Sequence, residues 1–495
     1  MLCYNKINMK SIFTPIFLLS FLILNISITY AAYDVNLKSG ASGKTVIELQ
    51  NFLIQNKYLK ASANSNYGPA TTAAVKAFQK DYKITQNGQF GPMTRAKAKA
   101  VASKNSNTNT TTNNSNSNTT NNTSSTGNSN TNNSNLNTKF TLDKNIKNIL
   151  AKTFTIGAWV PYWREASGSE EIVRNINKVD IVSPFSYEMT ETGTFKDPMK
   201  MGSGPYSEMI KVAKANGKLV VPSILWWATG EKGRGDVDFV LRDPDLRGAL
   251  VYDILAEVDK YGLDGIDIDF ENKKAETRDA FSTFLEELSN AMHNKNKILV
   301  CTIEARTPSD TEFVIGPDKE KELERSNDFK RIGQACDQVR IMAYDQDTGD
   351  KDLNNLRTGA YRPVADIDWV KKVLTLAMRD IEWKKIILGV PTYGYKYEIT
   401  KGLNGEINSY KRLGSMNWIY ADEEAKNRNI KPERHVSGEL FYTYYDAEKN
   451  KEYLVWYSDS ESIRQKAELS KLYKIGGISI FKIDGNNDQS IWSKI

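Results

Sequence analysis

Eight short apolar runs recur along the last two-thirds of the chain, separated by stretches with the spacing of amphipathic helices. Short apolar runs that alternate with helical stretches are typical of buried parallel strands. The runs are Thr155–Val160, Ile181–Tyr187, Lys218–Leu225, Gly265–Phe270, Ile298–Ile303, Val339–Ala343, Ile386–Tyr393 and Gly477–Ile483. Their number and order predict an α/β fold, a (β/α)8 TIM barrel, over residues 140–495.

The longest interval between two of these runs, residues 395–452, is rich in Tyr, Asn and Lys. It is too long for the single helix that normally connects two barrel strands. We therefore expect a small α+β insertion there.

A second pattern occupies residues 34–102. Val46, Leu49 and Leu53 share one face of a predicted helix, and Ala74 and Phe78 lie on the same face of another. Two Gly-Pro turns punctuate the segment, in Tyr67-Gly68-Pro69 and Phe90-Gly91-Pro92. The segment is expected to form a compact three-helix module. Residues 103–139 are almost wholly Asn, Thr and Ser, cannot bury an apolar core and are predicted to be a disordered linker.

The beginning of the chain predicts export. Lys6 and Lys10 precede a largely apolar run over residues 12–28, and Ala31 and Ala32 follow it. This order is typical of a secretory signal peptide over residues 1–31. The apolar run is also long enough to serve as an uncleaved membrane anchor. The protein is therefore expected to be secreted and associated with the cell wall, with a membrane contact only where the signal stays uncleaved.

Composition narrows the chemistry. The chain has 495 residues, 40% of them hydrophobic and 25% charged, with a net charge of +6. These values suit a soluble protein of more than one domain, and the charge is not concentrated into the basic patch expected of a nucleic-acid-binding protein. With two histidines, a zinc site or a Ser-His-Asp triad is not expected. No metal or organic cofactor is implied, Cys301 and Cys336 are expected to be free thiols, and the protein is expected to be a monomer.

The segment Asp264–Glu271, with the sequence DGIDIDFE, carries the candidate chemistry. On a strand, Asp267, Asp269 and Glu271 point to one face, about 6–7 Å from each same-face neighbour. Carboxyls this close cannot all ionise cheaply, so one proton is shared and at least one pKa rises. A protonated carboxylic acid is what cleavage of a glycosidic bond needs. A solvated strand edge or a calcium loop is the alternative, which the interleaved isoleucines and phenylalanine disfavour.

This octet resembles the fourth-strand signature of the family 18 glycoside hydrolases, the chitinases and their relatives. Three further segments resemble the family's later strands: Met342–Asp345, Leu388–Tyr395 and Gly476–Asp488. The resemblance extends over residues 155–495. The sequences LQNFL, YGPATTAAVKAFQ and NGQFGPMTRAK in the N-terminal module are similar to the peptidoglycan-binding domain family.

The resemblance implies a retaining mechanism in which the N-acetyl oxygen of the substrate attacks the anomeric carbon. Glu271 would be the general acid and then the base. Asp269 would support the acetamido group, and Asp267 would share a proton with Asp269. Tyr344 would hydrogen-bond the acetamido oxygen, and Asp345 would position the sugar.

Aromatic residues near the predicted strand ends supply further candidates for substrate binding: Tyr187, Trp163, Tyr393 and Phe481. Two features depart from the family. The third strand reads Val221-Pro222-Ser223-Ile224 where Ser-x-Gly-Gly is usual, and Phe481 replaces the eighth-strand tryptophan. Both point towards the branch that resembles spore-cortex and wall-lytic N-acetylglucosaminidases.

The sequence thus predicts a hydrolase of β-1,4 bonds in an N-acetylglucosamine-containing polymer, with peptidoglycan as the leading substrate. A chitinase that acts on chitin-like polysaccharide is the enzymatic alternative. A catalytically inactive, lectin-like barrel is the alternative from another class of protein.

Overall fold

The computed structural model describes four stretches of the chain, namely residues 35–102, 142–307, 326–484 and 490–495, apart from the single positions 83, 85, 92, 93, 96, 199, 228, 229, 348 and 358. The predicted signal peptide and the whole of the predicted linker lie outside the described residues. Among the helices that the structure describes, none has the length and apolar character that a membrane span needs.

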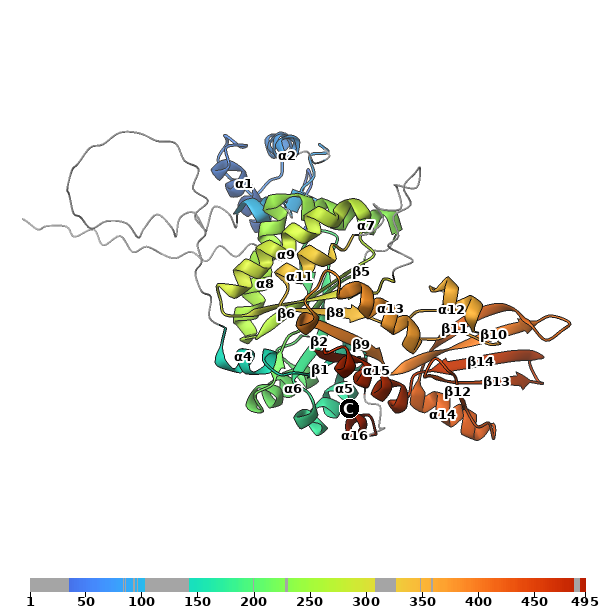
Figure 1. Ribbon diagram of the computed structural model, residues 1–495. Helices are drawn as coiled ribbons and strands as arrows, with labels where there is room; N and C mark the ends of the chain where they lie inside the picture. Colours follow the sequence, from blue (N-terminus) through green and yellow to red (C-terminus); the bar gives the residue numbers. More distant parts are fainter. Residues whose placement is uncertain are drawn as a thin grey trace, which may run out of the picture.

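A closed parallel barrel forms the centre of the large domain (Figure 1). Each strand pairs in parallel with its neighbours, and β1 closes the ring by pairing with both β2 and β15. The barrel strands are β1 (Thr155–Pro161), β2 (Ile181–Met189), β5 (Ser223–Trp227), β6 (Gly265–Glu271), β7 (Ile298–Glu304), β8 (Gln338–Met342), β9 (Ile386–Pro391) and β15 (Gly477–Phe481). The predicted TIM barrel is confirmed. The third apolar run is split in two, because β4 (Leu219–Val220) ends before Pro222, which has no N–H to donate to a ladder.

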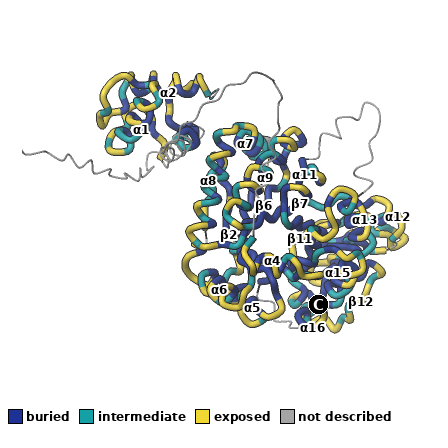
Figure 2. The backbone as a smooth tube through the Cα atoms, turned by 60° about the vertical axis from the view of Figure 1, so that its left-hand side comes forward, coloured by how far each residue is buried: buried dark blue, intermediate teal, exposed yellow. Residues whose placement is uncertain are grey.

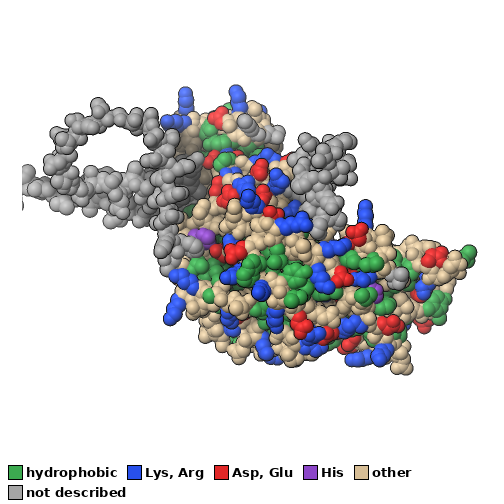
Figure 3. Space-filling model, viewed as in Figure 1, with side chains coloured by type: hydrophobic (Ala, Val, Ile, Leu, Met, Phe, Trp, Pro, Cys, Tyr) green, Lys and Arg blue, Asp and Glu red, His purple; other side chains and the backbone are tan. Residues whose placement is uncertain are grey.

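Helices surround the barrel, and their outer faces are exposed while the strands are buried (Figure 2). They are α5 (Glu165–Arg174), α6 (Gly204–Ala215), α7 (Gly230–Arg242), α8 (Pro244–Tyr261), α9 (Arg278–His293), α11 (Phe329–Ala335), α12 (Lys351–Leu356), α13 (Ile367–Ala377), α15 (Ser460–Leu472) and α16 (Ser490–Lys494). A further helix, α4 (Lys144–Leu150), packs Ile146 and Ile149 against Ile181 and Ile298, where β2 and β7 begin. Basic and acidic side chains are interspersed over the face seen in Figure 3.

The expected insertion is a five-stranded antiparallel sheet between β9 and β15. It contains β10 (Tyr393–Lys401), β11 (Ile407–Asn417), α14 (Trp418–Asn427), β12 (Glu433–Arg434), β13 (Leu440–Asp446) and β14 (Lys451–Tyr457). The strand order is β11-β10-β14-β13-β12. The sheet begins and ends a few residues outside the expected 395–452, because tyrosine-rich β10 continues almost directly from β9.

The N-terminal module contains α1 (Lys44–Gln55), α2 (Pro69–Asp81) and a further helical stretch that ends at residue 102. Its two halves repeat one hydrogen-bond arrangement. Gln50 Nε2 donates to Thr71 Oγ1, and Gln79 Nε2 donates to Thr94 Oγ1, each at 2.9 Å and each buried. The repeated Gly-Pro turns of the sequence therefore mark a true structural repeat.

The module contacts the barrel domain through its last helical stretch (Figure 1). Lys97 Nζ is 2.5 Å from Asp243 Oδ1 and 3.1 Å from Asp245 Oδ2, at the start of α8. Lys99 Nζ is 2.7 Å from Asp253 Oδ2 on the same helix. The Lys97 side chain is only 4% exposed, so this contact excludes water from a charged group.

One expectation about the cysteines is wrong. Cys301 on β7 and Cys336 after α11 form a disulfide, with Cα atoms 6.0 Å apart. The two residues are 35 positions apart in sequence, and the fold brings them together because α11 packs against α9 and leads directly into β8, the neighbour of β7.

Candidate active site

The three acids of β6 lie where the strand approaches the C-terminal end of the barrel. Asp267 is paired in register with Ser223 of β5, Asp269 with Leu225, and Glu271 with Trp227. Asp267 and Asp269 are buried, whereas Glu271 at the end of the strand is partly exposed. Active sites of this fold form at that end of the barrel.

Asp267 is held by hydrogen-bond donors from four other strands. Its Oδ2 accepts from Trp159 Nε1 at 3.1 Å, Ser223 Oγ at 2.7 Å and Arg340 at 3.0 Å. Its Oδ1 accepts from Thr302 Oγ1 at 2.8 Å. Asp267 and Arg340 are both almost fully buried. These four donors fix the position of the Asp267 carboxyl.

Asp269 has the opposite environment. Burial and the neighbouring carboxyls of Glu271 and Asp267 raise its pKa well above the usual value. Among the described residues, no donor hydrogen-bonds to its buried Oδ1. Asp269 therefore favours its protonated form and has one oxygen available for a substrate.

Glu271 has the raised pKa that a general acid needs. Burial is the largest cause, Glu304 and Asp345 add to it, and Lys273 opposes it, so that the pKa of Glu271 rises to about 7. A carboxyl with a pKa near neutral pH donates a proton and recovers it with similar ease.

Lys273 and Glu304 are two charged residues that act on Glu271 and that the sequence did not reveal; Lys273 is buried and Glu304 is partly exposed. Lys273 Nζ donates to the carbonyl of Phe270 and lies 4.3 Å from the ring centroid of Phe281. Glu304 accepts from the backbone N–H of Asn272 at 3.0 Å. Burial acts to raise the pKa of Glu304, but Lys273 and the hydrogen-bond donors outweigh it and hold that pKa below its usual value.

Asp345 receives two tyrosine hydroxyls. Tyr393 donates to Asp345 Oδ1 at 2.7 Å and Tyr395 donates to the same oxygen at 2.6 Å. Asp345 has a φ of 59°, a left-handed conformation that is uncommon for a residue other than glycine. Burial and the charges of Asp269 and Asp345 raise the pKa of Tyr344, which keeps its hydroxyl a hydrogen-bond donor.

Aromatic rings surround these acids. Phe481 stacks on Tyr344, with centroids 5.1 Å apart and planes 13° apart. Its ring also makes edge contacts with Trp159 and Tyr393, each at 6.0 Å. Trp163 is 49% exposed, and its ring contacts that of Phe185 at 6.1 Å. The structure therefore brings together all but one of the predicted site residues.

The exception is Tyr187, and its predicted role in substrate binding is wrong. Its hydroxyl donates to Glu257 of α8 at 3.0 Å, and the side chain is buried between the strand and the helices. A β-bulge between Phe185 and Tyr187 causes this, because it pairs Tyr187 with Ile224, a residue of the outer face. One extra residue in a strand turns every following side chain to the other face.

Arg340, which donates to Asp267, is a further site residue beyond those predicted from the sequence. The sequence did indicate that Arg340 has a special role, because a charged residue inside a predicted apolar strand requires a buried partner. Within the described ranges, no three His, Cys, Asp or Glu side chains are grouped so as to hold a metal ion.

A partly exposed acid of raised pKa at the C-terminal end of a TIM barrel, surrounded by aromatic rings, is typical of barrels that cleave carbohydrates. The family model "Glycosyl hydrolases family 18" matches residues 158–486, and the chain belongs to this family. Residues 42–97 match the peptidoglycan binding domain model. Both resemblances seen in the sequence are confirmed.

Two curated relatives come from Bacillus. The glycosylase YvbX of Bacillus subtilis is 29% identical over 237 residues, which cover 48% of this chain and 61% of that protein. The cortical fragment-lytic enzyme of Bacillus anthracis is 27% identical over 303 residues, which cover 60% of this chain and 63% of that protein. The chain thus spans about three-fifths of the length of these relatives.

A solved structure shares the fold. The spore cortex-lytic enzyme SleL of Bacillus cereus superposes with a TM-score of 0.55 at 22% identity, covering 69% of this chain and 73% of that one.

Proposed function

We propose that this protein hydrolyses β-1,4 glycosidic bonds of peptidoglycan as an endo-β-N-acetylglucosaminidase. The observation that carries the proposal is Glu271, a partly exposed acid whose pKa is raised to about 7, next to Asp269, whose pKa is also raised. The peptidoglycan-binding match and the cortex-lytic relatives support a wall substrate over chitin.

In the first step, the acetamido oxygen of the substrate attacks the anomeric carbon while Glu271 gives its proton to the leaving sugar oxygen. The bond to that oxygen breaks and an oxazolinium ring forms. Asp269 Oδ1, buried with no partner among the described side chains, accepts the acetamido N–H. Arg340 holds Asp267 in place, and Asp267 in turn lies close enough to Asp269 to act on it electrostatically.

In the second step, Glu271 takes a proton from water, whose oxygen attacks the anomeric carbon. The bond between that carbon and the acetamido oxygen breaks, the acetamido group is regenerated, and the original configuration is restored. Tyr344 donates to the acetamido oxygen, and Asp345 binds a sugar hydroxyl. Phe481 and Tyr393 form the floor under the reacting sugar. The exposed rings of Trp163 and Trp227 offer flat apolar faces to neighbouring sugars.

The remaining parts of the chain suit a wall enzyme. Residues 1–31 direct export, and the N-terminal module binds wall polymer, which raises the local concentration of substrate at the barrel.

The test is product mass spectrometry on purified peptidoglycan digested by the chain without residues 1–31, with reducing ends labelled by borohydride. Fragments that end in reduced N-acetylglucosamine are expected. Glu271→Gln removes the proton donor and should abolish nearly all turnover, whereas Glu276→Gln, the same change at an exposed glutamate, should keep it. Cleavage of chito-oligomers without release from peptidoglycan would instead support a chitinase. Binding without cleavage of either polymer would support a lectin.

A further inference from the structure

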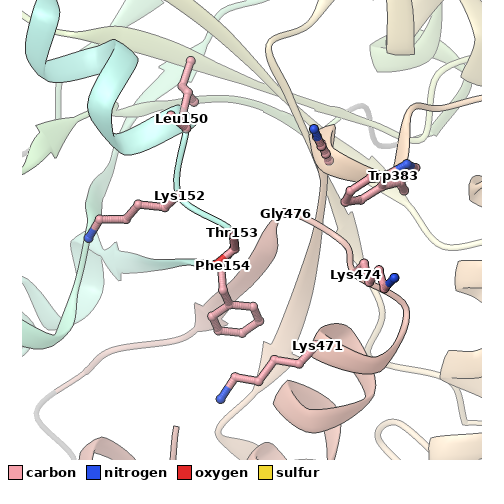
Figure 4. A pocket seen from close by; sticks show the side chains of 10 residues that line it. Leu150, Lys152, Thr153, Phe154, Trp383, Lys471, Lys474 and Gly476 are labelled. Atoms are coloured by element: carbon pink, nitrogen blue, oxygen red, sulfur yellow. The ribbon is translucent and has the colours of Figure 1, made fainter.

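A cavity of about 510 Å³ lies at the end of the barrel opposite to Glu271 (Figure 4). Three segments line it: the chain from Leu150 to Phe154 that leads into β1, the pair Trp383 and Lys384 before β9, and Lys471, Lys474 and Gly476 before β15. All three segments precede barrel strands, whereas Glu271 ends one. The volume is within the range of small-ligand sites, about 300–1,000 Å³.

The lining of this cavity, which we call the basic pocket, contains four lysines and no acidic residue. Lys152 is neutralised by Asp180, whose Oδ1 is 2.5 Å away. Lys384, Lys471 and Lys474 form no ion pair with any residue that the structure describes. Three uncompensated positive charges around one concave site favour an anionic ligand.

Two aromatic rings add an apolar face to the pocket. Trp383 is 40% exposed, and Lys384 Nζ lies 5.1 Å from its ring centroid. Lys471 Nζ lies 5.0 Å from the ring centroid of Phe154. Figure 4 shows the two rings on separate segments, Phe154 on the chain that leads into β1 and Trp383 before β9. A sugar or polyol stacks on such a ring while an attached anion contacts the ammonium groups.

We propose that the basic pocket binds an anionic wall polymer, with a phosphodiester group at Lys384, Lys471 and Lys474 and the adjoining sugar or polyol on Trp383. The choice of a wall polymer rests on the proposed function, which places the enzyme at the wall. A single phosphate is far smaller than the cavity, whereas a segment of several repeat units of a phosphodiester polymer matches its volume. A concave site also suits a chain segment better than the flat surface of a bilayer.

The experiment is isothermal titration calorimetry of the chain without residues 1–31 with a synthetic glycerol-phosphate hexamer. The combined variant Lys384→Ala, Lys471→Ala and Lys474→Ala is compared with a control that loses the same charge at exposed lysines elsewhere, Lys330→Ala, Lys411→Ala and Lys431→Ala. The pocket variant should weaken binding by about tenfold or more, since it removes three charge-assisted contacts. The control should change it by less than about twofold.

Further arms separate the sources of binding. Trp383→Ala should weaken the binding of the hexamer several-fold, because it removes the ring on which the polyol packs. It should leave the weak binding of inorganic phosphate unchanged. Glu271→Gln should bind the hexamer like the parent chain, so this test is independent of catalysis. Equal losses in pocket and control variants would overturn the proposal, because the attraction would then be general. Binding to vesicles of phosphatidylglycerol and phosphatidylcholine, without binding to the hexamer, would overturn it in favour of a membrane site.

Discussion

The protonation of Glu271 should set the upper pH limit of activity, and two neighbouring charges should move that limit in opposite directions. The acid must carry its proton when the glycosidic bond breaks, so kcat/KM should fall as the pH rises through about 7. The rise of the Glu271 pKa from 4.5 to about 7 corresponds to about 3 kcal/mol in favour of the protonated form. Glu304 contributes to this rise and Lys273 opposes it.

Glu304→Gln removes the negative charge and keeps an oxygen for the N–H of Asn272, the residue after Glu271. A neighbouring negative charge that acts through an effective dielectric constant of about 20 contributes on the order of 2 kcal/mol to the protonation of Glu271. Lys273 loses its partner in this variant and releases part of its own charge, which reduces the change. We expect the pH at which kcat/KM falls on the alkaline side, the alkaline limb of the profile, to decrease by about one pH unit.

Lys273→Met should move the same limb upward, because it removes the cation that lowers the pKa of Glu271. The shift should be smaller, about half a unit, since Glu304 then loses its main stabilising charge and takes up a proton more readily. The double variant removes both charges, and its limb should lie between those of the single variants.

The assay is kcat/KM for chito-oligomer hydrolysis from about pH 4 to about pH 9, with circular dichroism at each pH to confirm folding. Glu208→Gln, which removes one exposed negative charge on α6, is the matched control and should leave the limb in place. A limb that stays fixed in both single variants, or moves in the same direction in both, would refute this electrostatic account.

Three further predictions concern stability and domain contact. Arg340→Met leaves its carboxylate partner buried without a cation. The free energy of unfolding in urea should therefore fall by about 3–5 kcal/mol, and a decrease below about 1 kcal/mol would contradict the buried ion pair. Replacing Cys301 and Cys336 by alanine removes the bond that closes a 35-residue loop. The free energy of unfolding should fall by about 3–4 kcal/mol, because the unfolded chain gains conformational entropy. Equal stability of parent and variant would argue against the disulfide. Lys97→Glu places a negative charge of the N-terminal module against Asp243 at the start of α8. The two domains should then separate, and the radius of gyration in small-angle X-ray scattering should increase. Lys44→Glu, at the exposed start of α1, should leave that radius unchanged.

The sequence was informative where one physical constraint acts on neighbouring residues. Barrel strands are buried on both faces and therefore appear as apolar runs, which located all eight. The acids of β6 were visible because a strand alternates its faces, so their spacing alone placed Asp267, Asp269 and Glu271 together.

The sequence was uninformative where the constraint joins distant segments. The Cys301–Cys336 bond depends on the packing of α11, which no local pattern encodes. Tyr187 was misplaced because a single-residue bulge leaves no mark in the apolar pattern. Glu304 ends β7 and Lys273 follows β6, and their proximity comes from the pairing of these two strands, which neither residue's local sequence encodes.

The hydrogen bonds of Asp267 connect activity to the integrity of the whole barrel. Its donors come from β1, β5, β7 and β8, and Arg340 also donates to Ser183 of β2 at 2.8 Å. One carboxylate thus joins six of the eight barrel strands, counting its own. Partial opening of any of these strands would disturb the neighbour of Asp269 and stop turnover before the rest of the fold is lost. The enzyme's own activity is therefore a sensitive probe of barrel opening, and inactivation should never lag behind unfolding as the temperature rises.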